Sequence, residues 1–345
     1  MPILQFSAPE RAVINLKVVG VGGAGCHVIN RLIESGFDAS RCIAIDTFSH
    51  VDHHSFAEKN IRIGTRTTGG QGAGGNPQIG FESAKENEDE IEDALSGSDI
   101  VFITAGMGGG TGTGAASVIA DIAKKKGALT IGIVSKPFGF EGRKRLRLAE
   151  QGIERLEDVL DSLVIVPNNK LLSVSDRTTT MVDAFKKADD VLKNGVEAIV
   201  SIITEVGDIN IDFADVRTVM CNRGTAHIGV GSACGEGAVS RALKSAVDSP
   251  LLETSIKGAK AVLLSVSGGE QLSLLEVSNA ASSVCEEVDP GAIIIFGTNI
   301  KKELGDAVTV TIVAAGFDKT TAEKDVLLSN SKSDTNFPVP KFLEK

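Results

Sequence analysis

A glycine-rich run in the first half of the chain has the composition of an anion-binding loop. The run, GMGGGTGTG at residues 106–114, directly follows an apolar stretch at 99–105. Because glycine has no Cβ, the backbone can turn tightly and bring its N–H groups within hydrogen-bonding distance of phosphate oxygens. A helix-like segment at 115–123 directs its positive end at the same place, and threonine hydroxyls add donors. These residue types predict a phosphate-binding loop between a strand and a helix.

Two further glycine loops stand between strand-like and helix-like segments. The loop at 20–25, GVGGAG, fits GxGxxG, and Asp46 ends the next strand. Taken alone, this pattern indicates an NAD-dependent oxidoreductase with an acidic ribose ligand. That alternative leaves the run at 106–114 without a role. A third glycine-rich loop, GGQGAGGNP, lies at 69–77. Three such loops fit one polyphosphate held from several sides better than a pyrophosphate on a single helix.

The elements that position these loops predict an α/β fold with a doubly wound parallel sheet. The strand-like runs are continuously apolar, as expected for strands buried on both faces, and ligands bind such sheets at the carboxyl ends of the strands. The runs lie at 16–21, 42–45, 61–63, 100–104, 128–134 and 163–166. Helices are expected between them at 26–35, 78–95, 114–126 and 142–160.

A long amphipathic helix at about 179–206 has the length to join this sheet to a second, smaller α+β domain. Strand-like runs of that domain lie at 227–230, 259–266, 292–296 and 308–314, with helices near 236–247 and 271–284. We therefore expect an N-terminal tail at 1–15, a parallel-sheet domain at 16–178 and a connecting helix at 179–206. A C-terminal domain at 207–318, a flexible linker at 319–336 and a terminal peptide at 337–345 follow.

Composition excludes several classes of function. The 345 residues are 42% hydrophobic and 23% charged, an ordinary globular balance. No apolar run approaches the roughly 20 residues that span a bilayer, so we expect no direct membrane insertion. The net charge of −10 argues against nucleic-acid binding. The five cysteines form no CxxC pair, so we expect no metal site. The N-terminus lacks a signal-peptide pattern, and a cytoplasmic location is expected.

Taken in order, the motifs resemble those of prokaryotic members of the tubulin/FtsZ superfamily. GGGTGTG at 108–114 is similar to that family's signature, and the resemblance runs from about Leu16 to Asp318. The other matching motifs are GAGGNP at 72–77, KPFGFEGRKR at 136–145, PNNKLL at 167–172, AFKKADDVL at 184–192 and GDINIDFADVRTVM at 207–220. The resemblance implies a GTP-binding domain, a GTPase-activating domain, and a polymerising GTPase that converts GTP to GDP with Mg²⁺.

The resemblance also implies which loop residues contact GTP. The first loop would hold the α- and β-phosphates through Gly22, Gly23, Ala24 and Gly25. The second would hold the β- and γ-phosphates through Gly108, Gly109, Gly110, Thr111 and Gly112. The third would approach the γ-phosphate, and so distinguish GTP from GDP, through Gly72, Ala73 and Gly74.

Side chains implied to contact the nucleoside occur as pairs one helical turn apart. Glu141 and Arg145 would meet the ribose, although spacing alone favours a surface ion pair. Phe185 can stack on a purine. The Asp189 carboxylate can accept the ring N1–H and amino hydrogens of guanine, a pattern that adenine lacks. Without the motif, these two would be a core phenylalanine beside a solvated aspartate. Asn168 is a further implied ligand.

Two positions near the nucleotide depart from the family's pattern. Cys26 and His27 replace two asparagines, the second of which is expected near the guanine; His27 can still donate one hydrogen bond. The usual Asn-Thr-Asp after the second strand is Asp46-Thr47-Phe48, which moves the carboxylate two places earlier. The sequence leaves the effect of both departures on the nucleotide contacts open.

A candidate water-activating group lies in GDINIDFADVRTVM. Asp212 and Asp215 stand at the first turn of a helix, where acidic residues also act simply as caps. They follow the long helix, whose other end is near the nucleotide. A helix rises roughly 1.5 Å per residue, so some 25 residues of helix separate the two acids from the nucleotide of their own chain. The resemblance implies that subunits stack head to tail, so that Asp212, Asp215 and Asn210 complete the neighbour's site.

The chain ends in FPVPKFLEK, where apolar residues return after a polar stretch. Phe337–Leu343 resembles the peptide by which family members dock on a membrane-tethering division protein; the alternative is a disordered tail. The resemblance implies assembly into a ring at the mid-cell division site. A related polymer that shapes the cell without dividing it is the other alternative.

Overall fold

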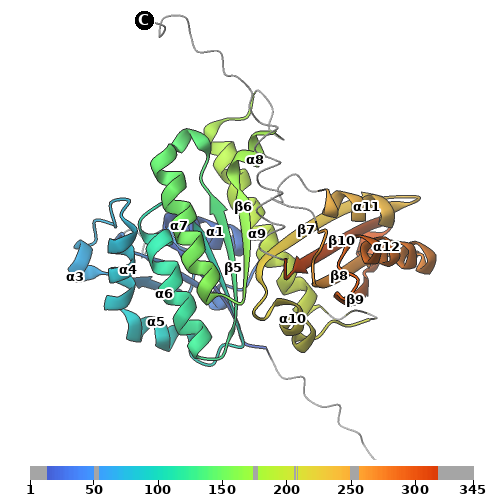
Figure 1. Cartoon of the computed structure of the whole chain (residues 1–345), viewed down its shortest axis with the longest axis horizontal. Coiled ribbons are helices and arrows are strands. Elements are labelled where there is room, and N and C mark those ends of the chain that lie inside the picture. Colours follow the sequence, from blue (N-terminus) through green and yellow to red (C-terminus); the bar gives the residue numbers. More distant parts are fainter. Residues whose placement is uncertain are drawn as a thin grey trace, which may run out of the picture.

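The computed structural model describes residues 14–49, 54–173, 178–205, 207, 209–248 and 256–317. Over these residues the strands form one ten-stranded sheet in the order β3-β2-β1-β4-β5-β6-β7-β10-β8-β9. Figure 1 labels β5 to β10 of this sheet. The predicted linker, the peptide Phe337–Leu343 and residues 1–13 of the predicted tail lie outside the described residues. In the described part of the chain, every helix is too short or too polar to cross a membrane.

The six strands at one end of this sheet are parallel, as the apolar runs predict. They are β1 (Leu16–Val21), β2 (Cys42–Asp46), β3 (Lys59–Arg62), β4 (Ile100–Gly106), β5 (Leu129–Lys136) and β6 (Ser162–Pro167). The chain winds outward in both directions from the neighbouring pair β1 and β4. This pair is the topological switch point, and two of the glycine loops follow these two strands.

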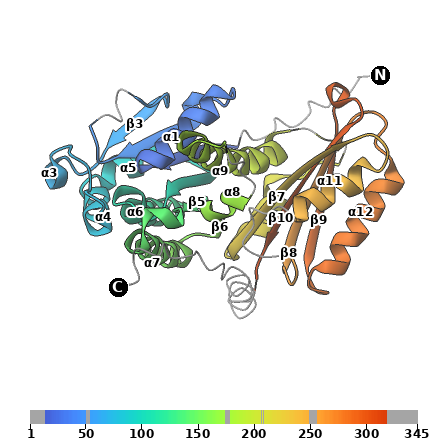
Figure 2. The ribbon, with the colours of Figure 1, turned by 90° about the horizontal axis from the view of Figure 1, so that it is seen from above.

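Helices cover both faces of this parallel region (Figure 2). One layer consists of α1 (Gly22–Glu34) and α9 (Met181–Thr204), and the other of α4 (Pro77–Glu86), α5 (Glu88–Leu95), α6 (Thr111–Lys125) and α7 (Arg143–Val159). Side chains alternate along a strand, so Leu16 and Val18 join the core under α1 and α9. Val19 and Val21 join the core on the opposite face. The short helices are α3 (Thr65–Thr68) and α8 (Asn168–Ser173).

The single helix expected at 78–95 is wrong, because Asn87 divides it into α4 and α5. The backbone of Asn87 has φ −111° and ψ 26°, outside the helical region. Its side-chain oxygen accepts a hydrogen bond from the Gly64 N–H at 2.9 Å. Asparagine competes in this way with the helix backbone for hydrogen bonds.

The C-terminal half is an α+β arrangement of helices on a mixed sheet. Its elements are α10 (Phe213–Met220), β7 (Gly224–Cys234), α11 (Ala238–Val247), β8 (Ala261–Gly268), α12 (Leu274–Glu287), β9 (Ile293–Ile300) and β10 (Ala307–Ala315). Strand β10 runs antiparallel to β7 and β8, and β9 runs parallel to β8. A separate apolar core lies between α11, α12 and these strands.

The two halves share one sheet, because β7 pairs in parallel with β6. The pairing is short and joins Ser162–Val164 to Gly224–Ala226. Helix α9 packs on β5, β6 and β7 and lies between the two halves (Figure 2). One end of α9 therefore lies beside the glycine loops, and the other beside α10 and β9.

Candidate functional site

A cavity of about 250 Å³ opens where β1, β4, β5 and β6 end, and it collects most of the predicted ligands. The predicted residues that line it are Gly22, Gly23, Ala24, Gly109, Gly110, Thr111, Gly112, Glu141, Arg145, Asn168, Phe185 and Asp189. Sequence reasoning missed Ser135 and Pro137, which line it too. Both follow the strand-like run at 128–134, and their position at a strand end was the available signal.

The three glycine loops lie against one another at this edge of the sheet. A Cβ atom at Gly22, where φ is 71°, would lie 3.0 Å from the amide nitrogen of Gly112. A Cβ atom at Gly110 would lie 2.7 Å from the Cβ of Ala73. Distances this short leave no room for side chains at either position. Glycine thus allows the first and third loops to meet the second from opposite sides.

Two helix N-termini point at this cavity without caps of their own. Helix α1 begins at Gly22 and α6 at Thr111; neither N-terminus has a side-chain cap or an acidic residue in its first turn. The N-terminus of α9, in contrast, is capped by the hydroxyl of Thr180. The free N–H groups and dipoles of α1 and α6 therefore converge on a site suited to a polyanion.

Side chains from η2 (Gly139–Glu141), α7 and α9 form the other end of the cavity. Glu141 and Arg145 make an ion pair at 2.9 Å, so the simple surface-pair interpretation also describes them. The second oxygen of Glu141 accepts from the Phe138 N–H at 2.8 Å. The Phe185 ring is 42% exposed and packs edge-on against Phe138. One face of an aromatic ring and one held carboxylate are thus available to a nucleoside.

Asp189 lies one turn after Phe185 and is mostly buried. Burial raises the pKa of its carboxyl to about 6, against the opposing effect of the positive charges of His27 and Arg31. Arg31 approaches it at 4.0 Å from α1 and also pairs with Asp190 at 2.9 Å. Asp189 therefore lines the cavity from α9, with the positive charge of Arg31 nearby on α1.

Asn168 has an unsatisfied acceptor that points to a ligand. The residue is 5% exposed and lines the cavity, and its Oδ1 atom has no hydrogen-bond partner in the structure. A buried acceptor without a donor costs about 1–3 kcal/mol. A bound molecule that donates a hydrogen bond here would remove that cost.

Several predicted ligands do not line the cavity: Gly25, Cys26, His27, Gly72, Ala73, Gly74 and Gly108. The Cys26 thiol is buried beneath α1, 3.9 Å from the Gly20 carbonyl oxygen, and burial raises its pKa. His27 is exposed, and its charge acts on Asp189. Ala73 packs against Gly110, and Gly74, the next residue, is exposed.

The predicted catalytic residues lie at the opposite end of α9. Asp212 and Asp215 form a capping box on α10, in which each backbone N–H donates to the other side chain, at 3.1 and 2.9 Å. Asn210 accepts from the Gly207 N–H at 2.7 Å. Asp212 and Asn210 are exposed. The 24 residues of α9 span about 36 Å, so these side chains do not reach the cavity of their own chain.

Comparison with known proteins identifies the family. The family model described as "Tubulin/FtsZ family, GTPase domain" matches residues 15–176, and "FtsZ family, C-terminal domain" matches residues 224–318. A solved FtsZ dimer from M. jannaschii is 44% identical, with 89% of each chain covered and a TM-score of 0.82. The chain belongs to the tubulin/FtsZ family. CetZ1 and CetZ2 from Haloferax volcanii, both 18% identical with TM-scores of 0.76, share the fold; the matches cover 91% and 93% of this chain and 99% of each of theirs.

Membership of the tubulin/FtsZ family makes the protein a GTPase that binds guanine nucleotide, and the NAD-dependent alternative is wrong. The side chain of Asp46, the ribose ligand of that alternative, instead accepts the Thr47 N–H at 2.7 Å and lies outside the cavity lining. Thr47 in turn bonds to Thr111 at 2.7 Å between hydroxyl oxygens. Thr47, the residue of this triplet that keeps the family's pattern, therefore contacts the first residue of α6.

Proposed function

We propose that this protein is a GTP-dependent cytoskeletal GTPase whose subunits stack head to tail, with each GTP hydrolysed at a site shared by two neighbours. The distribution of carboxylates carries this proposal. Among the described residues that line the cavity, the acidic side chains are Glu141 and Asp189, and both face a positive charge: Glu141 pairs with Arg145, and Asp189 lies 4.0 Å from Arg31. Neither carboxylate belongs to a glycine loop, so we infer that the group that activates water beside the γ-phosphate comes from elsewhere. Asp212, which is exposed, and Asp215, which is half-buried, lie at the far end of α9 instead.

The capping box suits Asp212 and Asp215 to act on a neighbour's nucleotide. Each carboxylate uses one oxygen in the cap, which fixes its orientation on α10. The second oxygen of each can accept a hydrogen bond from the attacking water, and Asn210 adds an amide beside them. Capping and catalysis are compatible roles of the same two residues.

The phosphate end of the cavity fits a Mg²⁺ ion held chiefly by the nucleotide. Mg²⁺ usually binds through phosphate oxygens and water with one or two protein ligands. The glycine loops offer N–H donors, and the hydroxyl groups of Thr111 and Ser135, which also line the described cavity, are available as oxygen ligands. When bound, the ion would offset γ-phosphate charge.

Concentration dependence tests the shared site. We expect GTP turnover per subunit to rise steeply with protein concentration. Asp212→Asn should abolish turnover while GTP binding stays intact, because asparagine keeps the cap on α10 but not the charge. Glu276→Gln, which removes a first-turn acid from α12, is the matched control. A monomeric preparation that hydrolyses GTP at the full specific rate would contradict the proposal.

We further propose that Phe337–Leu343 binds a membrane-tethering division protein and that the filaments assemble at mid-cell. The family's C-terminal domain model and the 44% identity to M. jannaschii FtsZ support a role in division over one in cell shape. We also propose the domain limits expected from the sequence, 16–178 for the GTP-binding domain and 207–318 for the C-terminal domain. Deleting residues 337–345 should abolish ring localisation of a fluorescent fusion. Sedimentation with GTP should be unchanged; loss of both would indicate a role in assembly instead.

A further inference from the structure

The segment that carries Asn210 and Asp212 lies along the outer edge of β9, the last strand of the sheet. Ile209 and Thr298 form an antiparallel bridge, with the Ile209 N–H donating to the Thr298 carbonyl at 3.3 Å. The Thr298 N–H returns a bond to the Ile209 carbonyl at 3.1 Å. A Cβ atom at Gly207 would clash with the Thr298 carbonyl oxygen, so the approach requires glycine. The position of this segment is therefore set by β9.

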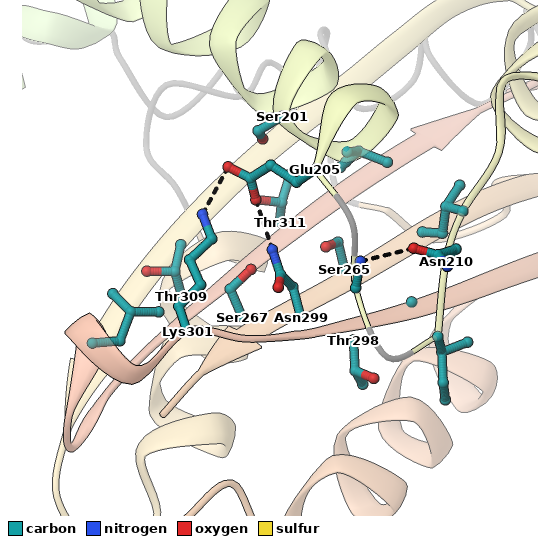
Figure 3. Close-up of a pocket in the computed structure, with 16 residues that line it drawn as sticks. Ser201, Glu205, Asn210, Ser265, Ser267, Thr298, Asn299, Lys301, Thr309 and Thr311 are labelled. Atoms are coloured by element: carbon teal, nitrogen blue, oxygen red, sulfur yellow. Dashed lines mark hydrogen bonds and ion pairs between the residues drawn. The ribbon is translucent and has the colours of Figure 1, made fainter. Parts of the chain in front are cut away.

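A polar clamp fixes the point at which the chain leaves α9 (Figure 3). The two carboxylate oxygens of Glu205, the C-cap residue of α9, accept from two residues at the end of β9. Lys301 Nζ donates to one at 2.7 Å, and Asn299 Nδ2 donates to the other at 2.9 Å. Both charged side chains are about one-third exposed. Charge-assisted bonds to both oxygens of a carboxylate restrict its direction as well as its distance.

Apolar packing alone does not hold this segment, because a polar cavity of about 160 Å³ lies behind it. Ser201, Ser265, Ser267, Thr309 and Thr311 line that cavity with hydroxyl groups (Figure 3). Ile211 is buried, whereas Ile209 is 51% exposed. Water can occupy such a polar space, so the segment has room to shift unless the clamp and the bridge hold it.

We propose that Glu205, held by Asn299 and Lys301, is a positioning residue for GTP hydrolysis in the neighbouring subunit. The proposal rests on the shared site described above. Glu205 fixes the exit from α9, and the Gly207–Asn210 bond and the Ile209–Thr298 bridge carry that position to Asp212, the cap of α10. Side chains of the C-terminal sheet thereby place the water-orienting acids.

Lys301→Met tests the clamp against Lys302→Met, a matched control at the adjacent residue. Lys302 is 82% exposed and pairs with exposed Glu270. A misplacement of about 1 Å can cost roughly a hundredfold in rate, so Lys301→Met should lower kcat roughly tenfold or more. GTP affinity and sedimentation with a non-hydrolysable analogue should be unchanged. The charge reversal Glu205→Lys with Lys301→Glu should restore turnover that Glu205→Lys alone removes. Equal kcat in the two lysine variants, or a charge reversal that restores nothing, would overturn the clamp.

A mixing experiment separates failure of the clamp from failure of the shared site. A donor carrying Phe185→Ala and Asp189→Ala keeps an intact acid segment but loses the base-binding side chains. Added to Lys301→Met or to Asp212→Asn, it should restore hydrolysis of the GTP that those variants bind. Rescue of Asp212→Asn without rescue of Lys301→Met would overturn the clamp alone. Rescue of neither would overturn the shared site and the clamp with it.

Discussion

Among individual residues, Asp189 shows how the fold tunes the pKa of a predicted ligand-binding group. The residue lies on α9 facing the cavity, and burial raises the pKa of its carboxyl to about 6. Arg31 and His27 on α1 lower it, but by less. The ionised form accepts two hydrogen bonds from guanine, whereas the protonated form must give up one oxygen as a donor. The predicted role of Asp189 as the guanine ligand therefore couples guanine recognition to the ionisation of its carboxyl.

This coupling predicts that affinity for guanine nucleotide falls as the pH drops below about 6. The folded pKa is raised, so binding must displace a proton below that value, and affinity should fall up to about tenfold per pH unit. Titration with a fluorescent GDP between pH 5 and 8 measures the effect. The Asp189→Asn variant should bind GDP more weakly at pH 8, and its affinity should depend less on pH. Some dependence should remain, because the phosphate groups of the nucleotide still titrate. An unchanged slope would assign the dependence to another group.

At the scale of elements, glycine content and apolar runs predict the site's framework better than its lining. Long glycine runs have few structural alternatives once they stand between a strand and a helix. The runs at 20–25 and 106–114 accordingly lie where β1 passes into α1 and where β4 passes into α6. Which residue of a loop faces the ligand depends on tertiary packing. Cys26 lies on the buried face of α1 instead of lining the cavity, a fact that no local pattern encodes.

The ends of elements show the same limit. The first helix begins at Gly22, four residues before the expected start, because the loop glycines themselves form its first turn. The break at Asn87 depends on a bond to Gly64, which is distant in sequence. Ser135 was missed because its role comes from its place at the end of β5, next to β4, and not from a motif.

In the whole molecule, the short β6–β7 pairing joins the nucleotide half to the half that carries the acid segment. Asp161 stabilises this junction: its Oδ2 accepts from the Thr130 N–H and hydroxyl, each at 2.9 Å. Its carbonyl accepts from the Arg223 N–H at 2.8 Å. Strand β7 continues from the junction into the pairing with β10. This junction therefore connects the nucleotide half to the half that carries the acid segment, as the proposed shared site requires.

His227 of β7 makes the stability of the whole fold dependent on pH. The residue is 5% exposed, packs edge-on against Phe317 and pairs in register with Ala314 of β10. Burial, and to a lesser degree the charge of Lys170, lowers the pKa of His227 from 6.5 to about 4. The imidazole of His227 therefore binds a proton more readily in the unfolded chain than in the folded one. The contribution of His227 to the stability of the fold falls as the pH drops from about 6.5 to about 4.

A pKa lowered by this much corresponds to about 3 kcal/mol of unfolding free energy. Asp189, with its raised pKa, has the opposite slope in the same range, so the wild type alone does not isolate the histidine. Comparing His227→Gln with the wild type isolates the histidine, because both proteins retain Asp189. We expect the variant to be less stable than the wild type at pH 7.5 and to lose much of that deficit by pH 4.5 in urea unfolding. A deficit that is constant across this range would show that His227 acts by packing alone.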